Sequence, residues 1–573
     1  MAGDVLATDV LIVGGGGAAL CAALHLTERA PALDVTIAVK GLLAKSGCTR
    51  MVQGGYNAVL NPADSFERHF ADTIAGGAFL NEQDLAWILV TRAPAMIREL
   101  ESRYGCFFDR APDGSIHQKP FGGQSFDRTV HRGDLTGIEI MERLRDAVLG
   151  RRVRVLEDHR AVGLLRDHGE ARVCGSVLLD MRRGRFLVAE ARATLLATGG
   201  GPTMYAVSSP SREKSTDGIA MAYAAGAEVM DMEMVQFHPT GLVVEGSELH
   251  GMVLEEGLRG VGGRLYNALG ERFMERYDPA RMERATRDVV SRACYLEARE
   301  GRGSPLGGVW LDLSHLDQDE IAQAFPGMVE RTRAAGYDLA RGRVEISPTA
   351  HYLMGGVRID ARCRTTLDGL YAAGEDASGV QGANRLGGNG VAESLVFGAL
   401  AGDVIAEEVG ARPRIPRDER EAERHIAQAS APLRRERGAD AYDLLDRLRR
   451  LMWDKVGVVR DGRLLDEAIA ELAELTTRAG TIGVHGSREA NVEWAAALNL
   501  HSLLVASTLI ARAAASRTES RGAHYRADFP AQDDREWLAH VVMRSGGDGP
   551  RLAVRPVCLT RMNPADALAE ADR

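Results

Sequence analysis

Five short segments carry arginine, histidine and glutamate residues of the types that bind a small dicarboxylate. The segments VQFHPTG, LEEGLRG, TRDVVSRA, PTAHYLMGG and QGANRLGG contain His238, Glu256, Arg259, Arg287, His351 and Arg385. An arginine binds a carboxylate through two parallel hydrogen bonds, and a histidine can donate to a second carboxylate and polarise an adjacent double bond. Taken singly, each residue is more often part of an ordinary ion pair, so the hypothesis rests on the whole set.

A glycine-rich turn near the N-terminus predicts a nucleotide site. In VLIVGGGGAAL the residues Gly14, Gly16 and Ala19 have the spacing that brings backbone N–H groups and a helix N-terminus against a pyrophosphate. The turn follows an apolar run and precedes a helical pattern, and DVTIAVK then reads as a second strand. Lys40 ends that strand, at the position where NAD dehydrogenases have a carboxylate that hydrogen-bonds the ribose. This difference argues against a plain NAD dehydrogenase. The alternative is a glycine turn that holds no ligand.

Two later segments repeat this combination of a buried strand and a glycine turn. LLATGGG contains Thr198 and Gly199, and GLYAAGEDASG contains Glu375. Three segments in which a glycine turn could bring the backbone close to a ligand are hard to explain as chance turns. The segment LLATGGG is typical of flavoproteins with two dinucleotide-type folds. Glu375 follows its strand at a place suited to holding a ribityl hydroxyl.

The composition excludes several classes of function. The chain has 573 residues and a formal net charge of -10, which does not favour nucleic acid as a partner. Its seven cysteines are dispersed and never form C-x-x-C, so no iron–sulfur, zinc or other metal site is expected. They fit a reducing compartment. We expect neither a signal peptide nor an apolar run of the ~20 residues that cross a bilayer. These features predict a cytoplasmic protein that reaches a membrane only through partners.

The motifs resemble, in order and nearly end to end, those of the flavoprotein subunits of succinate dehydrogenase and fumarate reductase, with L-aspartate oxidase as a relative. They include VGGGGAAL, VQGG, ATGGG, STDGIAMAYAAGA, VQFHPTG, EEGLRG, SPTAHYLMGGV and GANRLGGN. The resemblance implies an α/β fold with a Rossmann-type FAD-binding domain and an inserted α+β capping domain. A C-terminal helical bundle and a short tail domain follow. The expected segments are 1–241 and 351–410 for FAD, 242–350 for the cap, 411–520 for the bundle and 521–573 for the tail.

The resemblance also implies roles for individual residues. His238, His351 and Arg385 match carboxylate-binding positions, Arg287 the general acid and base, and Glu256 and Arg259 its proton relay. The residues expected to bind FAD are Gly14, Gly15, Gly16, Gly17, Ala18, Ala19, Lys40, Ser46, Cys48, Thr49, Gly54, Gly55, Ala161, Thr198, Gly199, Asp217, Glu375, Arg385, Gly390 and Val391. Those expected to bind substrate are Phe121, Gly122, Gln124, His238, Glu255, His351 and Arg385. The implied reaction interconverts fumarate and succinate, or a closely related dicarboxylate, by hydride transfer at flavin N5.

The implied partners are an iron–sulfur subunit, because this chain has no cluster ligands of its own, and membrane anchor subunits. No transmembrane segment is expected in this chain. The alternative is an oxidase of L-aspartate or another amino dicarboxylate, which uses dioxygen or fumarate. A third hypothesis, a flavin-binding subunit without catalysis, is disfavoured by the presence of the full residue set.

The sequence departs from the family pattern at three positions, Cys48, Glu255 and Val261, and differs from aspartate oxidase at Phe121. Cys48 occupies the place of the histidine that binds FAD covalently in the dehydrogenases and reductases, so we expect non-covalent FAD, with a cysteinyl bond as the alternative. Glu255 replaces a threonine that contacts a substrate carboxylate, which leaves open a substrate with an amino, amide or hydroxyl group. Val261 replaces a glutamate. Phe121 stands where aspartate oxidase has a glutamate that contacts the substrate amine, which favours an unaminated dicarboxylate.

Overall fold

The structure is a computed structural model that describes residues 4–169, 172–435, 437–547 and 549–564. Its centre is a five-stranded sheet in the order β18-β11-β2-β3-β7, in which every neighbouring pair is parallel. These strands span Leu370–Ala372, Ala193–Leu196, Val10–Val13, Val35–Ala38 and Val153–Leu156. The apolar runs VLIV, VTIA and ATLL are buried throughout, because both faces of a parallel sheet are covered.

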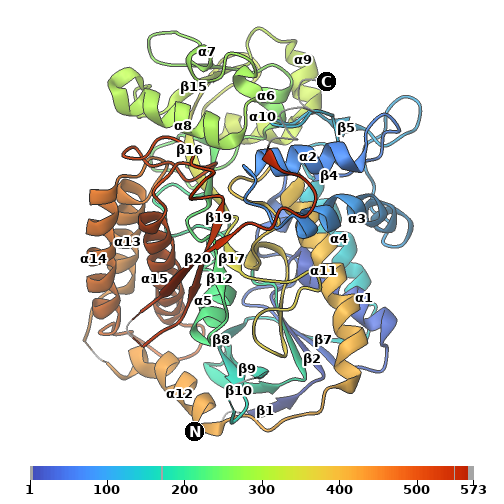
Figure 1. Ribbon diagram of the computed structural model, residues 1–573, viewed down its shortest axis with the longest axis vertical. Helices are drawn as coiled ribbons and strands as arrows, with labels where there is room; N and C mark the ends of the chain where they lie inside the picture. Colours follow the sequence, from blue (N-terminus) through green and yellow to red (C-terminus); the bar gives the residue numbers. More distant parts are fainter. Residues whose placement is uncertain (1–3, 170–171, 436, 548, 565–573) are drawn as a thin grey trace.

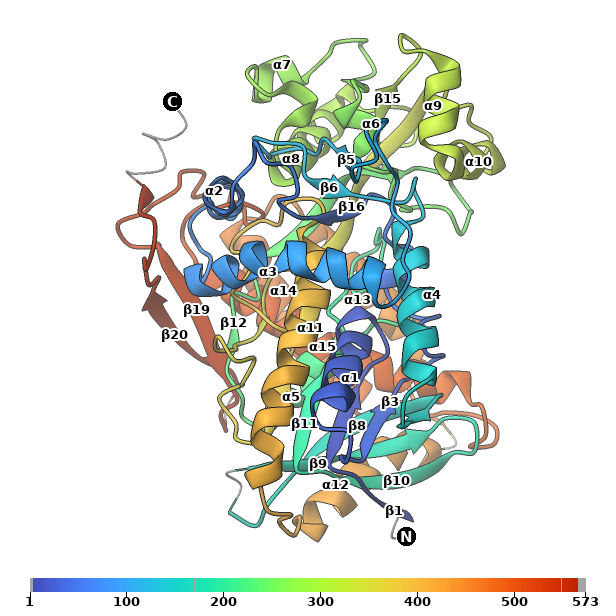
Figure 2. The ribbon, with the colours of Figure 1, turned by 90° about the vertical axis from the view of Figure 1, so that its right-hand side faces the viewer.

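Two glycines in α11 (Asn389–Glu408) let this helix pack closely against α1 (Gly17–Arg29). A Cβ atom on Gly398 would lie 2.4 Å from the carbonyl oxygen of Ala18, and one on Gly402 would lie 2.5 Å from that of Ala22. A side chain at either position would push the helices apart. The pair runs side by side next to the parallel sheet (Figures 1 and 2).

A second sheet, in the order β1-β10-β9-β8, lies at the N-terminal end of the molecule (Figure 1). Its strands span Asp4–Ala7, Arg185–Glu190, Val173–Asp180 and His159–Arg166. Helices α4 (Thr136–Leu149) and α5 (Asp217–Ala224) belong to the main body. Helices α2 (Phe66–Gly76) and α3 (Gln83–Ser102) lie between the parallel sheet and the cap, with a small sheet of β4 (Tyr56–Asn57), β6 (Thr129–Val130) and β5 (Gln118–Lys119) (Figure 2).

A separate sheet and its helices form a cap at the opposite end of the molecule (Figure 1). The sheet has the antiparallel order β13-β16-β15-β14, with bounds Val235–Leu242, Arg343–Leu353, Val309–Asp312 and Arg264–Tyr266. Its helices are α6 (Gly257–Gly260), α7 (Met274–Tyr277), α8 (Arg287–Glu297), α9 (Gln318–Ala324) and α10 (Pro326–Ala334). An apolar cluster from Leu242 to Ile346 gives the cap its own core. Because β13 and β16 enter it from the neighbouring part, the cap is built as an insertion.

The described C-terminal part consists of four long helices followed by two strands that pair with a sheet of the main body. The helices are α12 (Glu419–Ser430), α13 (Ala441–Lys455), α14 (Gly462–Ala479) and α15 (Val492–Ser516). Strands β19 (Ala539–Arg544) and β20 (Arg551–Pro556) then extend β12 (Val229–Met230) and β17 (Gly356–Val357) into one sheet. The architecture confirms the predicted α/β class with an inserted cap and a helical C-terminal part. The residue boundaries between the five segments stay a prediction.

Two helices are more apolar than expected from the sequence. Residues 389–411 and 492–516 reach the length and mean hydropathy of a membrane span, which corrects the expectation that no segment does so. Inside the protein, 89% and 67% of their apolar windows are buried. Burial of this kind is what the core helices of a folded domain require.

Candidate active site

A cavity of 640 Å³ runs from the carboxyl end of the parallel sheet to the cap, and most of the predicted site residues line it. The predicted residues along its wall are Gly14, Gly15, Gly16, Gly17, Ala18, Lys40, Ser46, Cys48, Thr49, Gly54, Gly55, Phe121, Ala161, Thr198, Gly199, Asp217, His238, Glu255, Glu256, Arg287, His351, Glu375, Arg385, Gly390 and Val391. One cavity therefore joins the predicted dinucleotide turn to the predicted dicarboxylate site.

Four predicted residues do not line this cavity. Ala19 is fully buried inside α1, and Arg259 lies behind Glu256. Gln124 donates from Nε2 to the carbonyl oxygen of Gly387 at 3.0 Å. Gly122 is packed so closely that a Cβ atom would lie 2.9 Å from Oε1 of Glu256. These four residues support the wall and do not form its surface.

The glycine turn leaves no room for side chains and presents free backbone donors. Gly14 has a φ of +123°, and a Cβ atom there would lie 2.0 Å from the carbonyl oxygen of Ala197 at the end of β11. Gly16 is the N-cap of α1 and provides no side-chain cap, and within the described residues the N–H of Ala18, at the cavity wall, has no hydrogen-bond partner. The N–H of Gly17 donates to Oγ1 of Thr49 at 3.2 Å. This donor set fits the pyrophosphate of a dinucleotide.

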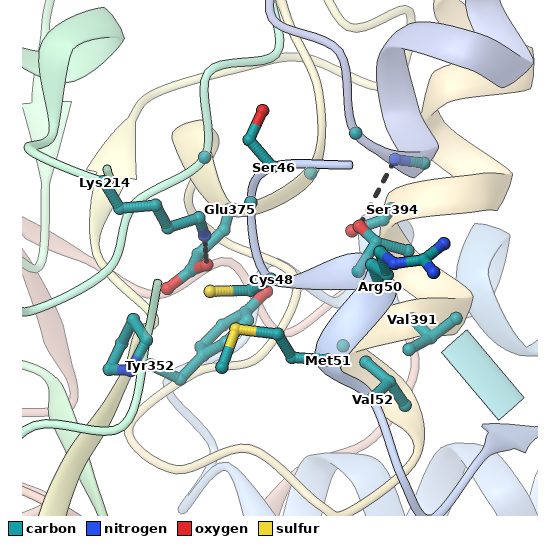
Figure 3. Close-up of a pocket in the computed structure, with 18 of the residues that line it drawn as sticks. Ser46, Cys48, Arg50, Met51, Val52, Lys214, Tyr352, Glu375, Val391 and Ser394 are labelled. Atoms are coloured by element: carbon teal, nitrogen blue, oxygen red, sulfur yellow. Dashed lines mark hydrogen bonds and ion pairs between the residues drawn. The ribbon is translucent and has the colours of Figure 1, made fainter. Parts of the chain in front are cut away.

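The loop that follows β3 forms another wall of the cavity. It places the thiol of Cys48 beside a buried ion pair (Figure 3). Lys214 contacts Oε2 of Glu375 at 2.5 Å, while Oε1 of Glu375 accepts from the N–H groups of Gly201 and Leu353 at 3.0 and 3.1 Å. Both oxygens of Glu375 are thus already engaged within the protein. Its expected bond to a ribityl hydroxyl stays a prediction.

Lys40 belongs to a buried polar cluster that the sequence analysis did not foresee. Its Nζ donates to Asp217 at 2.9 Å and to Ser215 at 2.8 Å, and Arg160 contacts the other oxygen of Asp217 at 2.7 Å. Burial alone would raise the pKa of Asp217, but Arg160 and Lys40 outweigh burial and hold this pKa well below its usual range. Lys40 is thus held by a carboxylate that comes from α5, 177 residues later in the sequence.

Arg287 is held at the cap side of the cavity by Glu256. Its Nε and Nη2 donate to Oε2 of Glu256 at 2.8 and 2.5 Å, and its Nη1 donates to Gln236 at 3.0 Å. Arg259 contacts the other oxygen of Glu256 at 3.2 Å. Burial alone would raise the pKa of Glu256, but Arg287 and then Arg259 outweigh it, so Glu256 stays ionised. The three residues form a continuous buried chain of charged groups.

The two histidines lie together in the same cavity. The rings of His238 and His351 are 5.2 Å apart between centroids, and Ser209 contacts Nδ1 of His351 at 2.8 Å. Burial is the main cause that lowers the pKa of both histidines far below the usual value, and Arg287 and Arg385 lower these pKa values further. Both rings are therefore neutral at pH 7, and a neutral imidazole carries one N–H donor. In His238 this donor is Nε2, because Nδ1 accepts from the N–H of Thr240.

Arg385 is oriented by an aromatic ring. Its guanidinium carbon lies 4.3 Å from the centroid of the Tyr352 ring, and the hydroxyl of Tyr352 contacts Glu393 at 2.7 Å. Burial, and then Arg287, lower the pKa of Arg385 to about 10, so it remains a cation at pH 7. Among the described residues its Nε has no hydrogen-bond partner. A buried cation with a free donor suits a carboxylate ligand.

Glu255 has a partner that the sequence analysis missed. Nζ of Lys119, on β5, contacts Oε1 of Glu255 at 3.0 Å, although the two residues are 136 positions apart. The only sequence signal was Glu255 itself, because a carboxylate at a substrate position calls for a compensating cation.

Two family models match the chain. One, described as an FAD binding domain, matches residues 9–391, and the other, described as the fumarate reductase flavoprotein C-term, matches residues 445–568. The chain is 41% identical over 546 residues to one subunit of the CoM/CoB fumarate reductase of Methanothermobacter marburgensis, covering 95% of this chain and 98% of that protein. It is 37% identical over 583 residues to the fumarate reductase flavoprotein subunit of Mycobacterium tuberculosis, covering 97% and 98%.

Solved structures agree with these matches. A quinol fumarate reductase chain of Escherichia coli superposes with a TM-score of 0.93 at 33% identity, covering 99% of both chains. The Sdh1 of Mycobacterium smegmatis, in complex with UQ1, superposes with a TM-score of 0.87 at 37% identity, covering 99% of this chain and 98% of that one. The fold and the site define an FAD-dependent oxidoreductase. The chain belongs to the family of fumarate reductase and succinate dehydrogenase flavoprotein subunits.

Proposed function

We propose that this chain reduces fumarate, or a closely related unsaturated dicarboxylate, to its saturated product and can run the reverse reaction. The observation that carries the proposal is the presence of Arg287, Arg385, His238 and His351 on the wall of the cavity that begins at the dinucleotide turn. Two buried cations and two neutral N–H donors match the four oxygens of a dicarboxylate.

FAD, when bound and reduced by an electron donor, would supply a hydride, that is, two electrons and one proton, to one carbon of the double bond. Arg287 donates a proton to the other carbon, so that two hydrogens add across the bond. Glu256 and Arg259 then return a proton to Arg287 from solvent. Arginine is protonated at neutral pH, and Glu256 stays ionised, so each group starts in the state that this transfer needs.

The residues that would hold FAD are those of the three glycine turns and of the Cys48 loop, which line one cavity. We propose that FAD is bound without a covalent link, because Cys48 replaces the tethering histidine. A covalent link of that kind raises the flavin potential and favours succinate oxidation, so its loss favours reduction of the double bond.

Electrons would reach this chain from an iron–sulfur subunit, since its seven dispersed cysteines do not form a cluster motif. We propose a cytoplasmic location, with attachment to a membrane only through such partner and anchor subunits. The structural match to a quinol fumarate reductase chain supports this arrangement.

One experiment separates this proposal from the alternative of an amino-dicarboxylate oxidase. The FAD-loaded chain is assayed with fumarate and reduced viologen, and in parallel with L-aspartate under air for release of hydrogen peroxide. Fumarate-dependent oxidation of the viologen without aspartate-dependent peroxide is the expected result. Peroxide from aspartate without fumarate turnover would establish the oxidase and overturn the proposal.

A further inference from the structure

Glu255 is a buried carboxylate with one oxygen left over. It is 2% exposed and lines the cavity, its Oε1 is held by Lys119, and its Oε2 has no hydrogen-bond partner within the described part of the chain. An unpartnered, buried carboxylate oxygen costs free energy unless a ligand or a proton satisfies it. The free oxygen therefore indicates a contact that forms with a bound molecule.

The ammonium group of Lys119 is held by contacts within the protein, so we do not expect it to bind a ligand directly. Its Nζ donates to the carbonyl oxygen of Gly133 at 2.8 Å and to Glu255 at 3.0 Å, and it lies 5.1 Å from the centroid of the Phe325 ring. These three contacts fix the ammonium group. Lys119 thus positions Glu255, which lines the cavity, and leaves its Oε2 without a hydrogen-bond partner within the described residues.

Backbone hydrogen bonds tie the Glu255 segment to the substrate histidine. Leu254, the preceding residue, donates its N–H to the carbonyl oxygen of Thr240 at 2.8 Å and accepts from Oγ1 of Thr240 at 2.7 Å. Thr240 in turn contacts Nδ1 of His238 at 3.0 Å. On its other side, Glu255 precedes Glu256, the partner of Arg287. The residue before Glu255 is thereby tied through Thr240 to the predicted carboxylate-binding histidine, and the residue after it holds the predicted proton donor.

The charged groups around Glu255 come from several elements. Lys119 lies on β5, Asp134 lies between β6 and α4, and Glu256 is the next residue, with Arg287 of α8 bound to it. Arg331 of α10 lines the same cavity. Burial first, and then the nearby carboxylates of Asp134 and Glu256, raise the pKa of Glu255 to about 7, although Lys119 opposes this shift.

We propose that Glu255 takes up a proton when a dicarboxylate binds and donates a hydrogen bond from Oε2 to one substrate carboxylate, so that recognition of the dianion is coupled to proton uptake. This inference rests on the proposed function. Two ionised carboxylates facing each other in a buried site repel, and protonation of one of them turns repulsion into a hydrogen bond. A substrate with an ammonium or hydroxyl group would instead require ionised Glu255 as an acceptor.

Calorimetry of malonate binding to the FAD-loaded chain tests this coupling. Heats measured in two buffers with different ionisation enthalpies give the number of protons taken up. At pH 8.5 uptake should approach one proton, and the dissociation constant should rise about tenfold per pH unit above the pKa of Glu255. In Glu255→Gln the amide is a permanent donor, so uptake should vanish and binding should no longer depend on pH in this range.

Two further variants test whether the proton taken up belongs to Glu255. In Lys119→Met the pH at which binding weakens should move upward, because the cation that favours ionised Glu255 is gone. Glu233→Gln is the matched control, since burial raises the pKa of Glu233 as well and its carboxylate contacts Arg517 rather than the cavity; its proton uptake should equal that of the wild type.

Malonate binding by the wild type without proton uptake, unchanged uptake in Glu255→Gln, or tighter binding at higher pH would each overturn the inference and leave the proposed function standing. If neither malonate, fumarate nor succinate bound the loaded chain at pH 6.5, the proposed function would fail, and the inference with it.

Discussion

Arg287 and Glu256 form a buried ion pair in which two guanidinium nitrogens contact the same carboxylate oxygen, at 2.8 and 2.5 Å. A third nitrogen of Arg287 donates to Gln236, so N–H groups on Nη1 and Nη2 remain for the cavity. Arg287 is the first residue of α8, where the helix dipole disfavours a cation. Glu256 compensates for that position and fixes the guanidinium against the cavity wall.

This geometry predicts that Arg287 is needed for turnover. Replacement by alanine should lower the rate of fumarate reduction with reduced viologen by about 10²–10⁴-fold, the range typical for removal of a positioned acid. Lysine should not restore the rate, because it lacks the planar fork that Glu256 and Gln236 hold. Arg281→Ala, an exposed arginine six residues earlier, is the control and should keep the wild-type rate. Turnover in Arg287→Ala within a factor of three of the control would refute the assigned role.

A second prediction concerns the glycine turn. In Gly14→Ala the new Cβ atom would meet the carbonyl oxygen of Ala197, and alanine would also be strained at a φ of +123°. We expect the purified variant to contain little FAD, measured as the ratio of absorbance at 450 nm to that at 280 nm (about five- to tenfold below the wild type). Gly114→Ala shares the positive φ but has open space around it, and it should retain its flavin. Equal flavin in the two variants would contradict the close approach.

Most residues that line the cavity could be predicted from the sequence, but the ion pairs that these residues form could not. Gly14 and Arg287 could be predicted because each stands in a recognisable sequence motif. A tight turn against a phosphate requires glycine, and two parallel hydrogen bonds to a carboxylate require arginine. Lys119 with Glu255, and Lys214 with Glu375, join residues 136 and 161 positions apart, and only the folded topology selects such partners. Glu375 was expected to hold a ribityl hydroxyl, which stays a prediction; its bonds to Lys214 and to two backbone N–H groups were not foreseen. The two long apolar helices were not expected as spans because their apolar runs are interrupted, by Gly398 and Gly402 in the first and by His501 and Arg512 in the second.

The third prediction concerns the link between protein and flavin. Burial raises the pKa of the Cys48 thiol above its usual value, although Lys214 opposes the shift. The thiolate is the nucleophilic form, so the protonated thiol should not attack the flavin at neutral pH. Acid precipitation should therefore release all FAD into the supernatant, and the protein should show no flavin fluorescence after denaturing electrophoresis. A fluorescent protein band that disappears in Cys48→Ser would instead demonstrate a cysteinyl bond.

The last prediction uses a titrating contact far from the cavity. His25 on α1 contacts Asp403 on α11 at 3.0 Å and Glu99 on α3 at 3.3 Å. Burial alone would lower the pKa of His25, but the bonds to Asp403 and Glu99 outweigh it and raise this pKa to about 9. A raised pKa stabilises the folded state fully below the unfolded value of ~6.5, and this stabilisation is lost as the pH rises through about 9.

His25→Gln should therefore unfold at a lower temperature than the wild type at pH 6, with a loss on the order of 1–3 kcal/mol, and the difference should shrink towards pH 9.5. Thermal unfolding at one scan rate, followed by circular dichroism across this pH range, measures the effect. His485, which is exposed and contacts Glu493, provides the control, because an ion pair in solvent contributes little and His485→Gln should leave the unfolding temperature almost unchanged. A His25→Gln difference that is constant from pH 6 to 9.5 would show that its proton does not link these three helices.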